Sequence, residues 1–234
     1  MSSVDDLMDL ISGGHLNEAA SMADACEDPV AMGSAFHSAV KAFYRERKDV
    51  TNMLVAGEMG VAYCRRMAVP GPDAEQTREL RKLARVIAFN TAVNCWPGWG
   101  DAGIVIEERH IRAGLELAAQ CRELSQELAL SPREQGGAHW LTGALELALG
   151  RLEIARAAFE EAERVYVAGE LTAYALMARG YIALTGKDAG ALNGALNRLR
   201  LEGSKDAIFF ADQIATADRL LFAARRSGPA AEGD

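Results

Sequence analysis

Glu107 and His110 stand three residues apart, and this spacing places a carboxylate and an imidazole on one face of a helix. Di-iron helical bundles use the same Glu-x-x-His spacing, but they need a second copy and two further carboxylates. The chain has no second copy, and His15 and Glu18 stand in the reverse order. We therefore expect Glu107 and His110 to lie on a solvated helix face, with no metal and no other cofactor. A metal-dependent helical enzyme is kept as an alternative.

Other signals of catalysis are missing from the sequence. There is no Gly-x-Ser-x-Gly nucleophile elbow and no Gly-x-x-x-x-Gly-Lys-Ser/Thr loop. No predicted strand precedes a glycine cluster, so phosphate binding on an α/β scaffold is not supported. His37 and His139 stand beside apolar residues, and we expect them at the edge of the core. These observations predict that the protein is not an enzyme.

The cysteines also argue against a metal site or a disulfide scaffold, because none of them forms a Cys-x-x-Cys pair. Four cysteines are sparse for a chain of this length. We expect them to be buried free thiols in a reducing cytoplasm. They are Cys26, Cys64, Cys95 and Cys121.

One predicted helix carries a basic stripe, because four basic residues stand at positions i, i+3, i+4 and i+7. They are Arg78, Arg81, Lys82 and Arg85. The opposite face is apolar. The stripe suits docking of an acidic partner or a phosphate-bearing ligand. The alternatives are a solvated face or internal pairing with the acidic residues 1–28, a segment without Lys or Arg.

The three tryptophans have two interpretations. Trp96, Trp99 and Trp140 either line an aromatic pocket or anchor a loop on a helical core. Trp96 and Trp99 flank Pro97 and Gly98, so they also suit a rigid exposed plug that contacts a partner. We retain all three as candidate partner-binding residues.

Composition favours an all-α protein. The 234 residues include 43 alanines, whereas Val, Ile and Thr together number only 28. The net charge of −8 argues against nucleic-acid binding, which needs clustered Lys and Arg. The first residues lack the pattern of a secretory signal, and no segment reaches the ~18 apolar residues of a membrane span. We expect a cytoplasmic protein, and the 20 arginines against 5 lysines suggest a GC-rich, bacterial genome.

Turn and capping residues divide the chain into ten or eleven antiparallel helices. Asp28-Pro29 begins one helix, Asp73 begins another with Gln76 completing a capping box, and Ser131-Pro132-Arg133-Glu134 is a second capping box. The strongest break is the segment 96–100, after which Asp101 is expected to begin a helix that reaches about Leu130. We expect a single domain over 1–226, with 96–100 as the candidate seam and 227–234 as a flexible tail.

Residues 136–169 carry a repeat signal. Two predicted helices of similar length meet at Gly150, and Gly143 is followed at fixed spacings by Ala155, Phe159 and Ala162. This pattern resembles a tetratricopeptide repeat (TPR). Degenerate neighbours include Leu171–Leu199. Glu146 replaces the usual tyrosine, and no proline closes the repeat.

The resemblance implies stacked helix pairs that form a right-handed superhelix with a concave groove lined by the first helices. Trp140, Ala144, Leu147 and Ala148 would then make the groove apolar near the repeat. The TPR subfamily that grips peptide C-termini uses Lys, Arg and Asn at such positions. This repeat lacks them, so we do not expect that activity.

These observations together predict a non-catalytic scaffold or adaptor that binds a protein or peptide partner in the groove. An acidic secretion-type or assembly chaperone is one form of this function. The alternative is a regulatory domain that senses a small molecule near the tryptophans. Neither a nucleic acid nor a membrane is expected as a partner, and a homodimer stays open.

Overall fold

The computed structural model describes residues 4–69, 74–186 and 188–226. Over these residues the chain forms eleven α-helices, one π-helical segment and one 3-10 turn, and it forms no strand. The predicted all-α class is therefore confirmed. The expected break at 70–72, the cap at Asp73 and the tail at 227–234 lie outside the described residues. None of the described helices is both long enough and apolar enough to cross a membrane.

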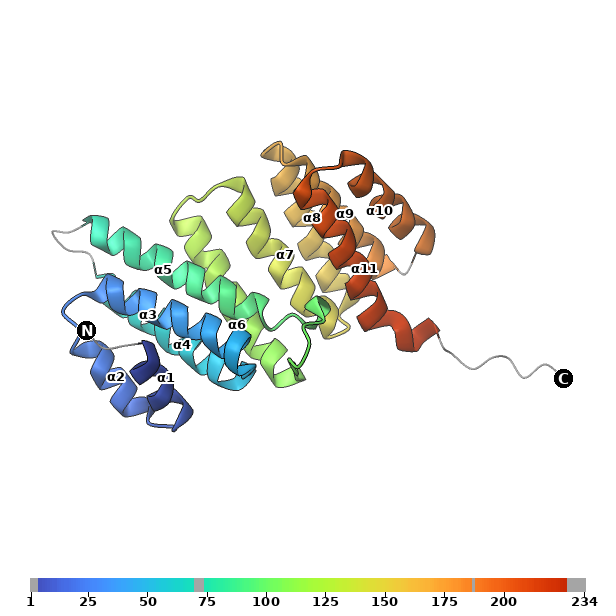
Figure 1. Cartoon of the computed structure of the whole chain (residues 1–234). Helices are drawn as coiled ribbons and strands as arrows, with labels where there is room; N and C mark the ends of the chain where they lie inside the picture. Colours follow the sequence, from blue (N-terminus) through green and yellow to red (C-terminus); the bar gives the residue numbers. More distant parts are fainter. Residues whose placement is uncertain (1–3, 70–73, 187, 227–234) are drawn as a thin grey trace.

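The helices follow one another along the chain from the blue to the red end of Figure 1. The first six are α1 (Val4–Ser12), α2 (Leu16–Asp24), α3 (Pro29–Ala42), α4 (Val50–Met67), α5 (Ala74–Val93) and α6 (Glu108–Glu127). The last five are α7 (Pro132–Ala148), α8 (Leu152–Ala168), α9 (Thr172–Gly186), α10 (Ala189–Glu202) and α11 (Lys205–Arg226).

The odd-numbered helices form a continuous row. From α3 onward each helix packs against the next, and α3, α5, α7, α9 and α11 also contact one another in series. One connected cluster of buried apolar residues runs from Leu7 on α1 to Phe222 on α11. The 3-10 turn η2 (Pro97–Trp99) lies at the expected seam and packs on α11.

Local capping explains where several helices begin. Asp28 accepts hydrogen bonds from the backbone N–H groups of Val30 and Ala31, both at 3.0 Å, and so caps α3 as predicted. Glu134 accepts from the backbone N–H of Ser131 at 3.2 Å, and the two residues form the predicted capping box of α7.

The prediction that Asp101 begins a helix is wrong. Helix α6 begins at Glu108, and Asp101 lies in a loop where it accepts a hydrogen bond from the Tyr44 hydroxyl at 2.7 Å. Gly100 and Gly103 have φ values of 68° and 78°, which a continuous right-handed helix does not contain. Because both glycines adopt the left-handed conformation, residues 100–103 form a loop and not part of a helix.

Hydrogen bonds join the loop after η2 to the segment that follows α3. There the chain forms the π-helical segment η1 (Phe43–Arg47), which ends at Lys48 with a φ of 53°. The Lys48 ammonium donates a hydrogen bond to the carbonyl oxygen of Ala102 at 2.8 Å. Together with the bond from Tyr44 to Asp101, this contact joins residues 101–102 to the N-terminal half of the molecule.

The helix pair expected at 136–169 is present as α7 and α8. Ala155, Phe159 and Ala162 are completely buried on α8, and Gly150 ends the turn between the helices with a φ of 75°. A methyl group at Gly143 would lie 2.6 Å from the Phe159 ring. The small residues therefore let the two helices approach closely, as the repeat pattern predicted.

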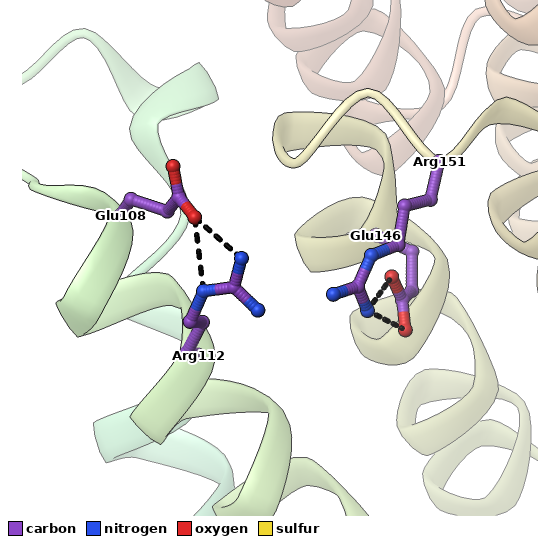
Figure 2. A network of polar contacts seen from close by, with 4 residues as sticks. All are labelled: Glu108, Arg112, Glu146 and Arg151. Atoms are coloured by element: carbon purple, nitrogen blue, oxygen red, sulfur yellow. Dashed lines mark hydrogen bonds and ion pairs between the residues drawn. The ribbon is translucent and has the colours of Figure 1, made fainter.

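Glu146 forms an ion pair across the α7–α8 turn. Its carboxylate accepts from Nη1 of Arg151 at 3.1 and 3.4 Å, and Arg151 is the residue that precedes α8 (Figure 2). Figure 2 also shows Glu108 and Arg112, paired at 2.9 Å one turn apart on α6. Because only 8% of Glu146 is exposed, its pair is shielded more than the surface pair on α6.

Gly143→Ala is expected to destabilise the protein, whereas Gly194→Ala is expected to stabilise it. Phe159 stacks on Tyr181 with ring centroids 5.0 Å apart. The Phe159 ring therefore cannot move away from a methyl group added at Gly143. This overpacking lowers the free energy of unfolding by about 1–3 kcal/mol. Replacing a helical glycine by alanine raises it by up to about 1 kcal/mol, so the loss is larger than the gain. At Gly194 nothing lies within 4 Å of the added carbon, so only the gain remains. Urea denaturation measures both changes, and shifts of the same sign would contradict the packing described here.

Candidate functional site

A cavity of about 710 Å³ opens along the row of odd-numbered helices, and we call it the aromatic groove. Helices α5, α7, α9 and α11 supply most of its walls, and the 3-10 turn adds Trp99. Figure 1 shows the loop that carries this turn, in green, reaching α11, in red. The aromatic lining residues are Phe89, Trp99, Trp140, Tyr166, Tyr174, Phe209 and Phe210. The polar ones are Arg85, Ser131, Arg133, Glu134, Asp206 and Gln213.

The rings of the groove belong to a larger aromatic network. It joins nine of the chain's fifteen aromatic residues through ring pairs with centroids 5.0–6.4 Å apart. The network begins in the core at Trp96, Phe159 and Tyr181 and continues through Trp140 and Trp99. It reaches the surface at Phe209, of which 54% is exposed. Because the rings support one another, the groove has a stiff aromatic floor.

Two hydrogen-bond donors in the groove wall have no partner. The indole nitrogen of Trp140 and the amide nitrogen of Gln213 are buried, and neither donates to an acceptor in the described part of the chain. The two residues are 5% and 7% exposed, and both line the groove. Leaving such a group unsatisfied costs about 1–3 kcal/mol, so these two donors destabilise the free protein.

Gln213→Met is expected to raise the free energy of unfolding by about 1 kcal/mol, because it removes an unsatisfied buried amide and keeps the side chain's length. Gln135→Met is the matched control. The Gln135 amide donates to the Leu130 carbonyl oxygen at 2.6 Å, so its loss is expected to destabilise the protein. Thermal and urea denaturation of both variants provide the measurement. A destabilised Gln213→Met variant would show that this amide has a partner in the free protein.

Two arginines in the groove have no carboxylate partner in the described part of the chain. Arg85 is 8% exposed and lies over the Phe89 ring; it donates to the Ser125 hydroxyl and to the Glu134 carbonyl oxygen at 3.2 and 3.3 Å. The guanidinium of Arg133 lies over the ring of Tyr174, 5.1 Å from its centroid. Both guanidinium groups therefore lie against rings, and neither forms an ion pair among the described residues.

The four residues of the basic stripe predicted on α5 differ in exposure. Arg78 is exposed, Arg81 and Lys82 are half-buried, and Arg85 turns into the groove. Lys82 pairs with Glu79 on its own helix at 3.5 Å. Among the described residues no ion pair joins α5 to the acidic N-terminal helices.

Of the apolar residues predicted as binding residues, only two line the groove. Trp99 is half-buried and donates from its indole nitrogen to the Val93 carbonyl oxygen at 2.8 Å, and Trp140 forms part of the floor. Trp96, Ala144 and Leu147 are core residues with exposures of 0, 0 and 3%. The last two are buried because α7 is enclosed by α5, α6, α8 and α9.

Sequence reasoning missed the contribution of α9 and α11. Tyr174, Phe209 and Gln213 belong to no motif, and they reach the groove only through the packing of distant helices. The adjacent aromatic residues Phe209 and Phe210 were the available signal, because two consecutive residues of a helix point in different directions and only one of these rings is buried.

His110 and Glu107 form the N-terminal cap of α6, in which Glu107 is exposed as predicted and His110 is not. Nδ1 of His110 accepts from the Glu107 backbone N–H at 3.1 Å, and Nε2 lies 3.2 Å from the Thr51 hydroxyl. His110 is only 5% exposed, so its expected solvent exposure is wrong. Both ring nitrogens have hydrogen-bond partners. The described residues bring together no group of three or more His, Cys, Asp or Glu side chains suited to a metal.

Lowering the pH from about 7 to about 5 is expected to destabilise the protein partly through His110. Burial, followed by the charge of Arg109, lowers the pKa of this imidazole from 6.5. The unfolded chain therefore takes up the proton first, and stability falls as the pH drops below 6.5. His110→Gln should flatten this pH dependence; His37 and His139, whose pKa values burial also lowers, retain the rest. An unchanged pH profile of urea midpoints would contradict the role given to His110.

The loop that carries Trp99 has glycines at the Gly-x-Gly-x-x-Gly spacing of dinucleotide-binding sites: Gly98, Gly100 and Gly103. In that fingerprint the glycines join a strand to a helix. Here they follow α5 and lie in the η2 turn and the loop after it. Carbons added at Gly100 and Gly103 would approach Leu220 of α11 and Lys48, so these glycines serve close packing of the loop.

No protein-family model, no curated protein and no solved structure matches this chain. The geometry of the groove therefore provides the evidence for function. The exposed parts of the groove that a ligand would contact include the ring of Phe209 and the guanidinium of Arg133.

Proposed function

We propose that the protein is a non-catalytic scaffold or adaptor that binds a protein or peptide partner in the aromatic groove. One observation carries the proposal: an aromatic network that begins in the core ends at the exposed ring of Phe209 in the wall of the groove. Exposed aromatic side chains on a rigid base are typical of the residues that dominate binding energy at protein interfaces.

The row of odd-numbered helices supports the proposal that the fold is a TPR-like array. In a TPR array the first helix of each pair lines the concave face. Here α7 is the first helix of the predicted repeat, and α5, α7, α9 and α11 supply most of the groove. We propose that these helices are the first helices of a right-handed array. We also place the protein in the cytoplasm of a bacterium, where its cysteines would stay reduced.

The test compares proteins captured from the source cells by three forms of the full chain: wild type, Phe209→Ala and Leu201→Ala. Leu201 is the control because it is 86% exposed on α10 and does not line the groove. A true partner is captured by the wild type and by Leu201→Ala, is lost with Phe209→Ala, and binds the purified wild type in calorimetry. If no protein follows this pattern, the proposed function is wrong.

The size of the groove favours a second candidate function, the sensing of a small molecule. About 710 Å³ lies within the range of ~300–1,000 Å³ that is usual for small-molecule sites. A thermal-shift screen of small aromatic acids against wild type and Phe209→Ala separates the two functions. A compound that stabilises the wild type and not the variant, without any protein partner passing the test above, would favour sensing.

A further inference from the structure

We propose that the protein partner at the groove is a second copy of this chain, and that the two copies pair their α11 helices in antiparallel orientation across the mouth of the groove. The inference rests on the proposed function and names the partner of the same site. It follows from the side chains that α11 leaves exposed, from their charges, and from the way an antiparallel pair matches them.

One side of α11 is apolar although it is open to solvent. Nine large apolar side chains of the described residues are exposed. Three of them belong to this helix: Ile208, Phe209 and Leu220, with exposures of 49, 54 and 48%. No other described helix carries more than two. A surface helix normally turns a polar face toward solvent, so this concentration of apolar side chains indicates a contact surface.

The apolar residues share this side of α11 with charged and small residues. We call the set the α11 face; its members recur at spacings of three and four and are Ile208, Phe209, Asp212, Ala215, Thr216, Arg219 and Leu220. Ala215 and Thr216 lie in the middle of the face, and their small side chains allow another helix to approach closely. The face adjoins the groove, because the Phe209 ring lies 6.4 Å from the Trp99 ring.

The charges of the α11 face favour an antiparallel pair. Asp212 and Arg219 are exposed, and neither forms an ion pair among the described residues. They stand two turns apart, about 10 Å along the helix axis. In a parallel pair each charge would face its own equivalent and be repelled. An antiparallel pair brings Asp212 of each copy to Arg219 of the other, so two attractive contacts form.

The same orientation also matches the apolar residues. When Phe209 lies opposite Leu220 of the second copy, the twofold axis crosses the pair between residues 214 and 215, beside the small Ala215. Asp212 is then displaced from Arg219 of the second copy by two residues, or about 3 Å along the axis. An arginine side chain is longer than this displacement. One register therefore covers the exposed ring of Phe209 and pairs all four charges.

Self-complementarity identifies the occupant as a second copy. In a twofold interface the same surface supplies both halves, so it must carry opposite charges on either side of the axis, as Asp212 and Arg219 do. A small molecule in the groove would leave Ile208 and Leu220 exposed, because neither lines the groove. Residues 227–234 include no large apolar side chain that could cover them.

Sedimentation equilibrium of the purified full chain, from low to high micromolar concentration, tests the pairing. We expect a monomer–dimer equilibrium. Phe209→Ala should weaken dimerisation at least thirtyfold, because the ring acts as a hot spot and is lost twice in each dimer. Ile154→Ala is the control, because Ile154 is 53% exposed on α8, away from the α11 face. It should dimerise as the wild type does.

Charge variants test the orientation. Asp212→Asn should weaken dimerisation by about two- to thirtyfold, because one substitution removes two exposed ion pairs. In a parallel pair it would strengthen dimerisation, since it would remove a repulsion. Asp212→Arg and Arg219→Asp should each be monomeric at concentrations where the wild type is a dimer. An equimolar mixture of these two variants should form a heterodimer, because opposite charges then meet at both contacts.

The outcomes separate this inference from the proposed function. A monomer at every concentration, a dimer that Phe209→Ala leaves intact, a dimer that Asp212→Asn strengthens, or charge variants that do not pair when mixed would each overturn the inference. If the capture experiment then identifies a different protein that Phe209→Ala loses, the scaffold function stands. If it identifies none, the inference and the scaffold function are both wrong.

Discussion

Phe159→Ala is expected to lower the free energy of unfolding by about 3–5 kcal/mol, the largest effect of any single change considered for this molecule. The ring is completely buried, stacks on Tyr181 at 5.0 Å and fills the space beside Gly143. Neither α7 nor α9 can close a cavity of this size, because their contacts with α8 also include other buried side chains. Urea denaturation measures the loss.

Val167→Ala on the same helix is the control, because Val167 is 53% exposed and its shortening should cost little. A Phe159→Ala variant that loses no more stability than this control would show that α8 is not held by its apolar face. The arrangement of α7, α8 and α9 would then have to be revised.

Trp99→Ala is expected to weaken partner binding by about 2–4 kcal/mol, or roughly 30- to 1,000-fold. Trp99 joins the rings of Trp140 and Phe209, and its indole N–H holds the 3-10 turn to Val93. The substitution therefore removes part of the groove wall, and it also loosens the loop at 97–107. Calorimetry with the partner that the capture experiment identifies measures the loss of affinity. Hydrogen exchange over residues 97–107 measures the loosening of the loop.

Val105→Ala serves as the control in the same loop. Val105 is 70% exposed and lines no part of the groove, so this variant should bind the partner normally. Normal binding by Trp99→Ala as well would mean that the partner contacts another face of the protein, and the groove would lose its assigned role.

The sequence predicted the parts of the fold that depend on local chemistry. Asp28, and Ser131 with Glu134, act as caps because capping needs only residues within one turn of each other. The packing of Gly143 on Phe159 was also predictable, because a helix pair repeats its contacts at fixed spacings. The error at Asp101 arose because a competing tertiary partner, Tyr44, is 57 residues away.

The groove could be predicted only in part. Trp99 was a candidate as a tryptophan in the break at 96–100, and Trp140 as a residue of the groove that the repeat pattern implies, but nothing in the sequence places Phe209 beside them. Ala144 and Leu147 lie on the same helix as Trp140, and four other helices contact this helix. The periodicity of the sequence does not show which face of such a helix remains exposed to solvent. The unused donors of Trp140 and Gln213 are visible only once the surrounding acceptors have been placed.

The position of Trp99 has a mechanical consequence. Trp99 lines both the aromatic groove and a neighbouring cavity of about 520 Å³, whose other walls include Asp101 and Ala102. Tyr44 and Lys48, which bind this loop to the N-terminal half, line the same second cavity. A change in the orientation of the Trp99 indole would therefore alter the shape of both cavities.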